Sequence, residues 1–249
     1  MTGQISTEKF NDLICLVVSI ERATARRAAI ARQLEALGLR FEFVNGIDVS
    51  TNDVRQHPEF DFDKARHRYR REVLPAEMAC AHAHINCYRK FLESDAKHAL
   101  IFEDDAILTP AMQEFLHGGH YRCFPFLMLN HSNAWARRSG FKTFFEGIQV
   151  VRTLNAPYMC VGYCLDRASA ARVLEAGVPV SGPPDWPMDI SKLQVRVVEP
   201  FLVLHPPVEK TGQSMIGDRA FARRRWKSDY FTGWYWRRKW AKLTAQRIS

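Results

Sequence analysis

The segment Ala99-Leu100-Ile101-Phe102-Glu103-Asp104-Asp105-Ala106-Ile107-Leu108 decides the fold of this chain. Its apolar run up to Phe102 is typical of a buried strand. Glu103, Asp104 and Asp105 then fall at the carboxyl end of that strand, where open α/β sheets bind ligands. Adjacent carboxylates repel one another and are costly to bury unpaired, so a divalent cation such as magnesium or manganese is the simplest relief. A solvated acidic turn is the alternative.

Strand-like and helix-like patterns alternate along the chain, which indicates an α/β layer fold. Besides the strand that carries the acidic triplet, strands are expected at Leu13 to Ser19, Phe41 to Val44, Phe126 to Leu129, Met159 to Leu165, Gln194 to Val198 and Phe201 to Leu204. Helices are expected at Thr24 to Leu37, Pro75 to about Leu92, and Ala168 to Ala176. The polar stretch 50–72 predicts a loop.

The composition is that of an ordinary globular protein, with 249 residues, 47% hydrophobic and 25% charged. The longest apolar run, Leu13 to Ile20, has about eight residues, far fewer than the ~20 that cross a bilayer. The first ten residues show no signal-peptide pattern. Six cysteines without a secretory signal indicate reduced thiols and a cytoplasmic location.

The net charge of +8 is unevenly spread, which suggests a domain over 1–216 and a basic, aromatic extension over 217–249. Tryptophan and tyrosine among arginines suit an anionic membrane surface, where they lie at headgroup level. A helix that packs its tryptophans on the domain is the second interpretation, and a nucleic-acid contact is the third. We expect peripheral contact with the inner face of the cytoplasmic membrane.

A possible zinc cluster occurs in Cys80-Ala81-His82-Ala83-His84-Ile85-Asn86-Cys87. On a helix, Cys80, His84 and Cys87 share one face, and His82 points away from it. Only three ligands result, and no partner pair of cysteines or histidines exists, so structural zinc is not expected. His84 is then either a core histidine or a polar group directed at a ligand.

No nucleophile elbow or glycine-rich phosphate loop is present. Folds that phosphorylate an aspartate carry it after their first strand, whereas the acidic triplet lies in mid-chain. The triplet therefore predicts a metal and diphosphate site. His205 is the candidate for a later metal ligand, or else a capping or core histidine. Asp185 and Asp189, in a proline-rich loop, are candidates for a general base or for turn formation.

Taken together, the motifs of residues 13–216 resemble glycosyltransferase family 25, the lipooligosaccharide and collagen-type galactosyltransferases. Val18 to Arg27 resembles the first conserved motif of that family. Arg26 stands at the family's characteristic arginine, and Ser19 stands where an asparagine is usual. Phe43 to Asp48 resembles the family's second motif, with its aspartate at Asp48. The motif Glu77 to His84 is similar to the family's cysteine and Ser-His block, with Ala83 in place of serine. The acidic triplet matches closely.

Later motifs resemble the same family. Val161-Gly162-Tyr163 is similar to the strand behind its site, and Asp185 or Asp189 could be its later aspartate, with Asp185 slightly favoured. Pro200 to His205 and Ser214-Met215-Ile216 resemble the last motif of the family, with Met215 where an acidic residue is usual.

The resemblance implies a GT-A-like mixed sheet flanked by helices, a Rossmann-like nucleotide-sugar-binding fold. It implies a UDP-sugar donor, often UDP-galactose, and an inverting reaction that needs a base. Glu103, Asp105 and His205 would hold Mn²⁺ or Mg²⁺. The nucleotide sugar would be bound by the following residues: Arg26, Asp48, His84, Asp104 and Gly162.

The hypothesis is therefore transfer of a hexose to a lipooligosaccharide or other surface glycan. A non-catalytic member of the same fold, which binds glycans or a partner, is one alternative. A basic nucleic-acid-binding protein with an incidental acidic triplet is the other, although no nucleic acid is expected as partner.

Overall fold

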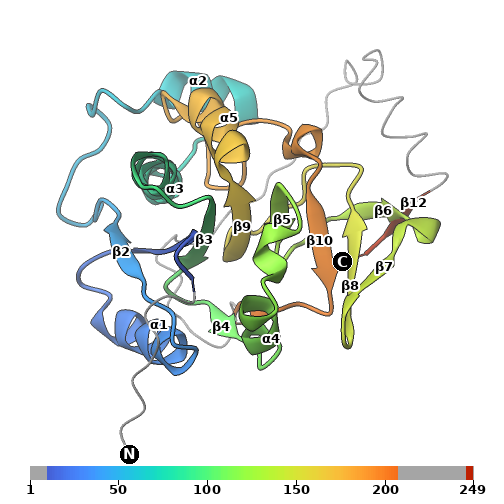
Figure 1. The fold of residues 1–249 in the computed structure, drawn as a ribbon. Coiled ribbons are helices and arrows are strands. Elements are labelled where there is room, and N and C mark those ends of the chain that lie inside the picture. Colours follow the sequence, from blue (N-terminus) through green and yellow to red (C-terminus); the bar gives the residue numbers. More distant parts are fainter. Residues whose placement is uncertain (1–9, 207–244, 249) are drawn as a thin grey trace, which may run out of the picture.

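A mixed eight-stranded sheet forms the centre of the structure, with strand order β2-β1-β3-β9-β5-β10-β8-β7 (Figure 1). The computed structural model describes residues 10–206 and 245–248. The strands of the sheet are β1 (Leu13–Ser19), β2 (Glu42–Asn45), β3 (His98–Glu103), β5 (Phe126–Met128), β7 (Lys142–Phe145), β8 (Ile148–Arg152), β9 (Gly162–Asp166) and β10 (Arg196–Glu199). The predicted α/β architecture is confirmed.

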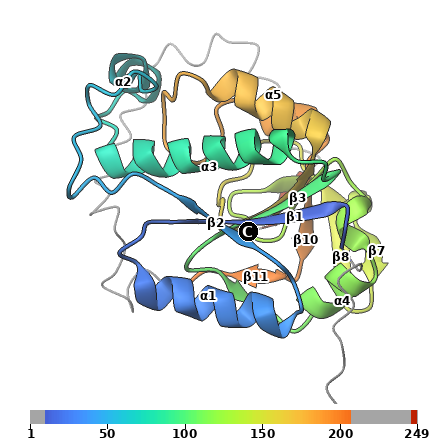
Figure 2. The ribbon, with the colours of Figure 1, turned by 60° about the vertical axis from the view of Figure 1, so that its left-hand side comes forward.

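Helices cover both faces of this sheet, as Figure 2 shows, with α3 and α5 over one face and α1 over the other. The helices are α1 (Thr24–Ala36), α2 (Phe62–Tyr69), α3 (Pro75–Glu93), α4 (Met112–His117) and α5 (Arg167–Gly177). Short 3₁₀ turns lie at His120–Arg122, Arg138–Gly140 and Ile190–Leu193.

Strand β3 is buried on both sides, which accounts for its continuous apolar sequence. Because side chains alternate along a strand, Ala99 and Ile101 join the core beneath α3 and α5. Leu100 and Phe102 join the opposite core, beneath α1 and α4. All four side chains are fully buried. The strand that carries the acidic triplet is therefore held from both faces.

The carboxyl ends of three neighbouring parallel strands meet at one edge of the sheet. Strand β1 pairs with β2 and β3 in parallel, so Ser19, Asn45 and Glu103 lie at this edge. Strand β9 runs antiparallel to β3, and its first residue, Gly162, pairs with Phe102 at the same edge. The fold thus gathers four of the predicted site segments in one place.

The expected strands and helices occur within a few residues of their predicted bounds, but the loop predicted for 50–72 is wrong. Helix α2 lies within it. The Asp61 carboxylate accepts a hydrogen bond from the backbone N–H of Lys64 and so caps the start of α2. Its apolar residues, Phe62, Ala65 and Tyr69, have helical spacing, but only Ala65 is buried and the other five residues are charged or histidine, so the apolar signal is weak.

Smaller pairings complete the described structure. Strand β11 (Val203–Leu204) pairs with β4 (Ile107–Leu108) just beyond the acidic triplet. Strand β12 (Ala245–Arg247) pairs antiparallel with β6 (Trp135–Arg137). The predicted boundary at 216, the Ser214 to Ile216 motif and most of the extension over 217–249 lie outside the described residues. Within the described part of the chain, no helix has the length and apolarity to cross a bilayer.

Arg167 closes the carboxyl end of α3. Its guanidinium donates hydrogen bonds to the backbone carbonyls of Phe91, Leu92, Ser94 and Ala96, at 2.6–3.2 Å. These carbonyls end a 19-residue helix, and a cation there also interacts favourably with the helix dipole. One side chain of α5 therefore fixes the position of α3 above β3.

We expect Arg167→Met to lower the free energy of unfolding by about 2 kcal/mol, because charged hydrogen bonds to four carbonyls are lost while the apolar stem is kept. Urea unfolding monitored by circular dichroism measures the change. Arg172→Met, on the exposed side of the same helix, is the matched control. Equal stabilities of the two variants would contradict the capping role.

Candidate active site

Asp104 is the buried member of the acidic triplet. Its carboxylate accepts a hydrogen bond of 2.6 Å from the hydroxyl of Ser19, and Arg26 Nε lies 3.2 Å from its other oxygen. Burial raises the pKa of Asp104 to about 6, although Ser19 and Arg26 both oppose this rise. The first helix and the first strand thus supply the partners of this carboxylate. A solvated acidic turn does not describe it.

Asp105 faces His205, which follows β11. Its Oδ2 lies 3.4 Å from His205 Nε2 and 3.8 Å from Arg26 Nη1. The hydrogen bond to Asp105 raises the pKa of His205. The other oxygen, Oδ1, is buried and has no hydrogen-bond partner among the described residues. A buried carboxylate oxygen without a partner, beside an imidazole, fits a divalent cation.

Glu103 turns in a third direction, towards α3. Its Oε1 lies 3.3 Å from His84 Nε2 and 4.0 Å from Cys80 Sγ. His84 Nδ1 is in turn 2.8 Å from the hydroxyl of Tyr163, which lies 2.8 Å from the hydroxyl of Tyr88. Of the three predicted metal ligands, the structure therefore brings Asp105 and His205 into contact and pairs Glu103 with His84.

Asp48 and Gly162 lie near this edge in different roles. Hydrogen bonds from Ser50 and an ion pair with Arg22 lower the pKa of Asp48 to about 2, and the structure gives it no contact with the acidic triplet. A Cβ on Gly162 would lie 3.0 Å from Val203 and 3.2 Å from Phe102. A side chain at this first residue of β9 would therefore crowd Val203 and Phe102, so a glycine fits best there.

The two candidate bases differ in their surroundings. Asp189 is exposed, and it caps the 3₁₀ turn that follows by accepting hydrogen bonds from the N–H and hydroxyl of Ser191. Asp185 accepts a hydrogen bond of 3.3 Å from the N–H of Met159. Burial, together with Asp185, Glu103 and Cys80, raises the pKa of the Cys160 thiol well above its ordinary value. Asp185 and Glu103 therefore both lie near enough to Cys160 to act on its thiol.

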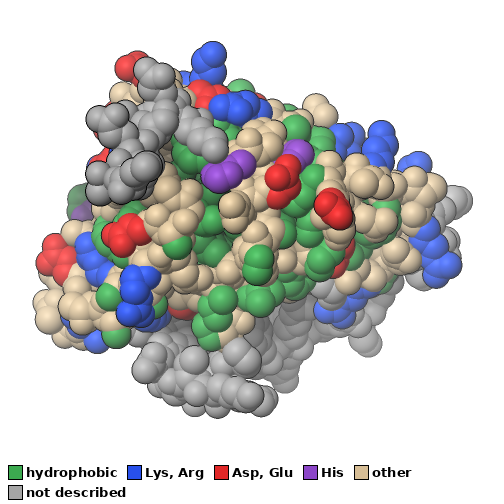
Figure 3. Space-filling view, turned by 60° about the horizontal axis from the view of Figure 1, so that its bottom comes forward, with side chains coloured by type: hydrophobic (Ala, Val, Ile, Leu, Met, Phe, Trp, Pro, Cys, Tyr) green, Lys and Arg blue, Asp and Glu red, His purple; other side chains and the backbone are tan. Residues whose placement is uncertain are grey.

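The surface view in Figure 3 shows acidic and histidine side chains close together near the middle of one face, beside hydrophobic side chains. Lysine and arginine side chains lie mainly towards the margins of that face. Such a mixture of a few polar groups on an apolar background is typical of a ligand site.

Ser19, Cys80 and Tyr163 contact the acidic triplet or its partners but are absent from the predicted site residues. The sequence marks Ser19 only as a departure from an asparagine, because its contact with Asp104 spans 85 positions of sequence. Helical spacing pairs Cys80 with Cys87, but Cys87 is fully buried and Glu103 lies beside Cys80 and His84. His82 points elsewhere, as predicted, and contacts Glu59.

The sequence matches the profile of glycosyltransferase family 25 (LPS biosynthesis protein) over residues 13–188. The chain belongs to glycosyltransferase family 25. The match includes the acidic triplet and Asp185, while Asp189 and His205 follow it. No curated protein matches this chain.

Among solved structures, the chain is similar to a glycosyltransferase involved in the glycosylation of the major capsid of PBCV-1. The identity is 9% and the TM-score 0.33, and the comparison covers 66% of each chain. This chain thus spans just under two thirds of that structure's length. Family 25 is linked to LPS biosynthesis, and the mixed sheet flanked by helices is consistent with the GT-A fold.

The raised pKa of Asp104 predicts a specific pH dependence of stability in this family 25 protein. Its folded-state value is about 6, against 3.8 for an ordinary aspartate. Between these values the folded chain keeps a proton that the unfolded chain has released, so the free energy of unfolding falls as pH rises. The loss amounts to roughly 3 kcal/mol, at about 1.4 kcal/mol per pH unit of pKa difference.

Asp104→Asn keeps an acceptor for Ser19 and removes the titration. We expect the stability of the wild type relative to this variant to fall from pH 4 to pH 6, as measured by urea unfolding at several pH values. Parallel stability curves for the two proteins would contradict the assignment to Asp104.

Proposed function

We propose that this protein transfers a hexose, with galactose as the expected sugar, from a UDP-sugar to a lipooligosaccharide or other surface-glycan acceptor. The reaction would be metal-assisted and inverting. The family supplies the reaction class, and the finer assignment rests on one observation. The buried Oδ1 of Asp105 has no described partner and lies in a carboxylate that faces His205, at the carboxyl edge of the sheet.

Asp105 and His205 are the residues that would hold Mn²⁺ or Mg²⁺. A cation held there would supply positive charge to the diphosphate leaving group. Arg26 is half-buried between Asp104 and Asp105, and its planar fork of donors suits diphosphate oxygens. Glu103 adds negative charge beside the cation without being needed as its ligand.

Asp185 is the proposed base for the acceptor hydroxyl. An inverting transfer needs a carboxylate that takes the proton of the attacking hydroxyl as the new bond forms. Asp185 and Glu103 both act on the Cys160 thiol, whereas Asp189 already serves as a cap. Asp48 keeps its proposed role beside the nucleotide sugar, and Gly162 contributes by allowing close packing. His84 would act there only through Glu103, because Tyr163 and Glu103 occupy its two ring nitrogens.

Loss of the Asp105 carboxylate is expected to reduce metal-dependent UDP-sugar hydrolysis by about 100-fold or more, because a negatively charged ligand of the cation is removed. The measurement is UDP release by Asp105→Asn across a panel of UDP-sugars, with Mn²⁺ present or removed by chelation. Asp95→Asn, exposed and at the other end of β3, is the matched control.

Full activity of Asp105→Asn would contradict the metal assignment. Thermal stabilisation of the wild type by UDP and Mn²⁺ without any turnover would favour the non-catalytic alternative. Salt-sensitive binding of oligonucleotides with no response to UDP would favour the nucleic-acid alternative.

A comparison of two asparagine variants tests the base. Asp185→Asn is expected to lower kcat for transfer by about 100-fold or more while UDP and Mn²⁺ still bind, because a general base contributes roughly that factor. Asp189→Asn is expected to keep its stability, because asparagine caps about as well as aspartate, and to show a far smaller change in kcat. The reverse order of kcat values would move the base to Asp189.

A further inference from the structure

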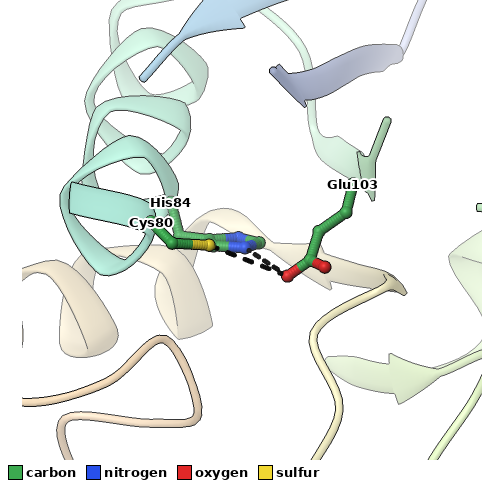
Figure 4. A group of neighbouring side chains, drawn as sticks. All are labelled: Cys80, His84 and Glu103. Atoms are coloured by element: carbon green, nitrogen blue, oxygen red, sulfur yellow. Dashed lines mark hydrogen bonds and ion pairs between the residues drawn. The ribbon is translucent and has the colours of Figure 1, made fainter. Parts of the chain in front are cut away.

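Three metal-ligating side chains converge where helix α3 meets the end of β3. Figure 4 shows Cys80 and His84 projecting from one face of α3 towards the carboxylate of Glu103. Their ligand atoms all lie within 4.8 Å of one another. The two helical residues are four positions apart, so they stand one turn above each other. The arrangement therefore joins two rigid elements through three donors.

The spacing of these atoms fits a small tetrahedral ion. Zinc bonds of about 2.0 Å to nitrogen and oxygen and about 2.3 Å to sulfur place nitrogen and oxygen ligands about 3.3 Å apart in a tetrahedron, and oxygen and sulfur about 3.5 Å apart. The distance from His84 Nε2 to Glu103 Oε1 is 3.3 Å, and that from Cys80 Sγ to the same oxygen is 4.0 Å. A small rotation of the thiol side chain would close the second distance.

The donor set selects a different class of ion from the one proposed at Asp105. A thiolate and an imidazole favour zinc and related borderline-soft metals, whereas magnesium and manganese favour oxygen ligands. Three protein ligands leave the fourth tetrahedral position for water.

The surroundings of His84 are those of a metal-bound histidine. A ligating imidazole needs its second nitrogen held by another group, which fixes the ring and its tautomer. The hydroxyl of Tyr163 lies 2.8 Å from Nδ1, and Tyr88 supports that hydroxyl. His84, Tyr163 and Tyr88 are each buried to at least 97%. The ring is therefore held in place with Nε2 directed at Glu103.

We propose that Cys80, His84 and Glu103 form a binding site for zinc or a similar borderline-soft divalent metal, separate from the cation held by Asp105 and His205. Binding releases the Cys80 thiol proton to solvent and leaves the imidazole N–H on Nδ1, donating to Tyr163. The ion joins α3 to the end of β3 and directs Glu103 away from Asp105.

Cobalt substitution tests the site directly, because a thiolate bound to Co²⁺ gives an intense near-ultraviolet charge-transfer absorption. Titration of the full-length protein with Co²⁺ under reducing conditions is expected to produce this band with one equivalent of metal, and added Zn²⁺ is expected to remove it. Cys80→Ser should abolish the band. Cys123→Ser, which changes an exposed thiol outside the cluster, should keep it.

Zinc affinity gives a second readout. Competition with a chromophoric chelator is expected to show at least about 10-fold weaker binding by Cys80→Ser and His84→Gln than by the wild type. Circular dichroism of the metal-free variants checks that they fold, and if His84→Gln does not, the milder Cys80→Ser decides. Absence of the band from the wild type, or an unchanged band in Cys80→Ser, would overturn the proposal.

The outcome is separable from that of the proposed transferase. Asp105→Asn should keep the cobalt band even though it loses hydrolysis. A cobalt band in a protein that hydrolyses no UDP-sugar would support the zinc site and contradict the transferase. Hydrolysis without a cobalt band would do the opposite.

Discussion

The repulsion between three consecutive carboxylates is the constraint on which the candidate site depends. Strand β3 lies between two helical layers and leads into these groups, of which Asp104 is buried and Glu103 and Asp105 are partly exposed. The structure separates them by direction. Glu103 faces α3, Asp104 faces Ser19 and Arg26, and Asp105 faces His205. Arg26 lies between Asp104 and Asp105, and the three carboxylates draw their partners from the N-terminal segment, from α3 and from the residue after β11.

The rigidity of the sheet makes this separation possible. Because β3 is packed on both faces, the backbone at its end has little freedom, and each side chain leaves it at a fixed angle. Helix α3 must then stand at a fixed height to present His84. Arg167, bound to four carbonyls at the end of that helix, keeps it there. The position of His84 thus depends in part on a contact at the carboxyl end of α3.

The local sequence predicted the buried strand and the acidic residues at its end, because that signal lies within one segment. It could not predict which group each carboxylate meets, since Ser19 and Asp104 are 85 positions apart and only the parallel pairing of β1 and β3 joins them. The sequence signal for helix α2 is weak because only three of its eight residues, Phe62, Ala65 and Tyr69, are apolar and only Ala65 is buried. Helical spacing groups Cys80 with Cys87 and cannot reveal that Glu103 approaches the same face of α3.

The division of the triplet also determines how its charges influence one another. Asp104 keeps its proton to about pH 6 chiefly through burial, and the negative charges of Asp105 and Glu103 add to that rise. A divalent cation beside either neighbour reverses the sign of that neighbour's contribution and favours ionised Asp104. Ionised Asp104 in turn holds Arg26 more strongly. A metal beside Glu103 or Asp105 would therefore strengthen the ion pair between Asp104 and Arg26. Arg26 is the residue proposed to bind the diphosphate.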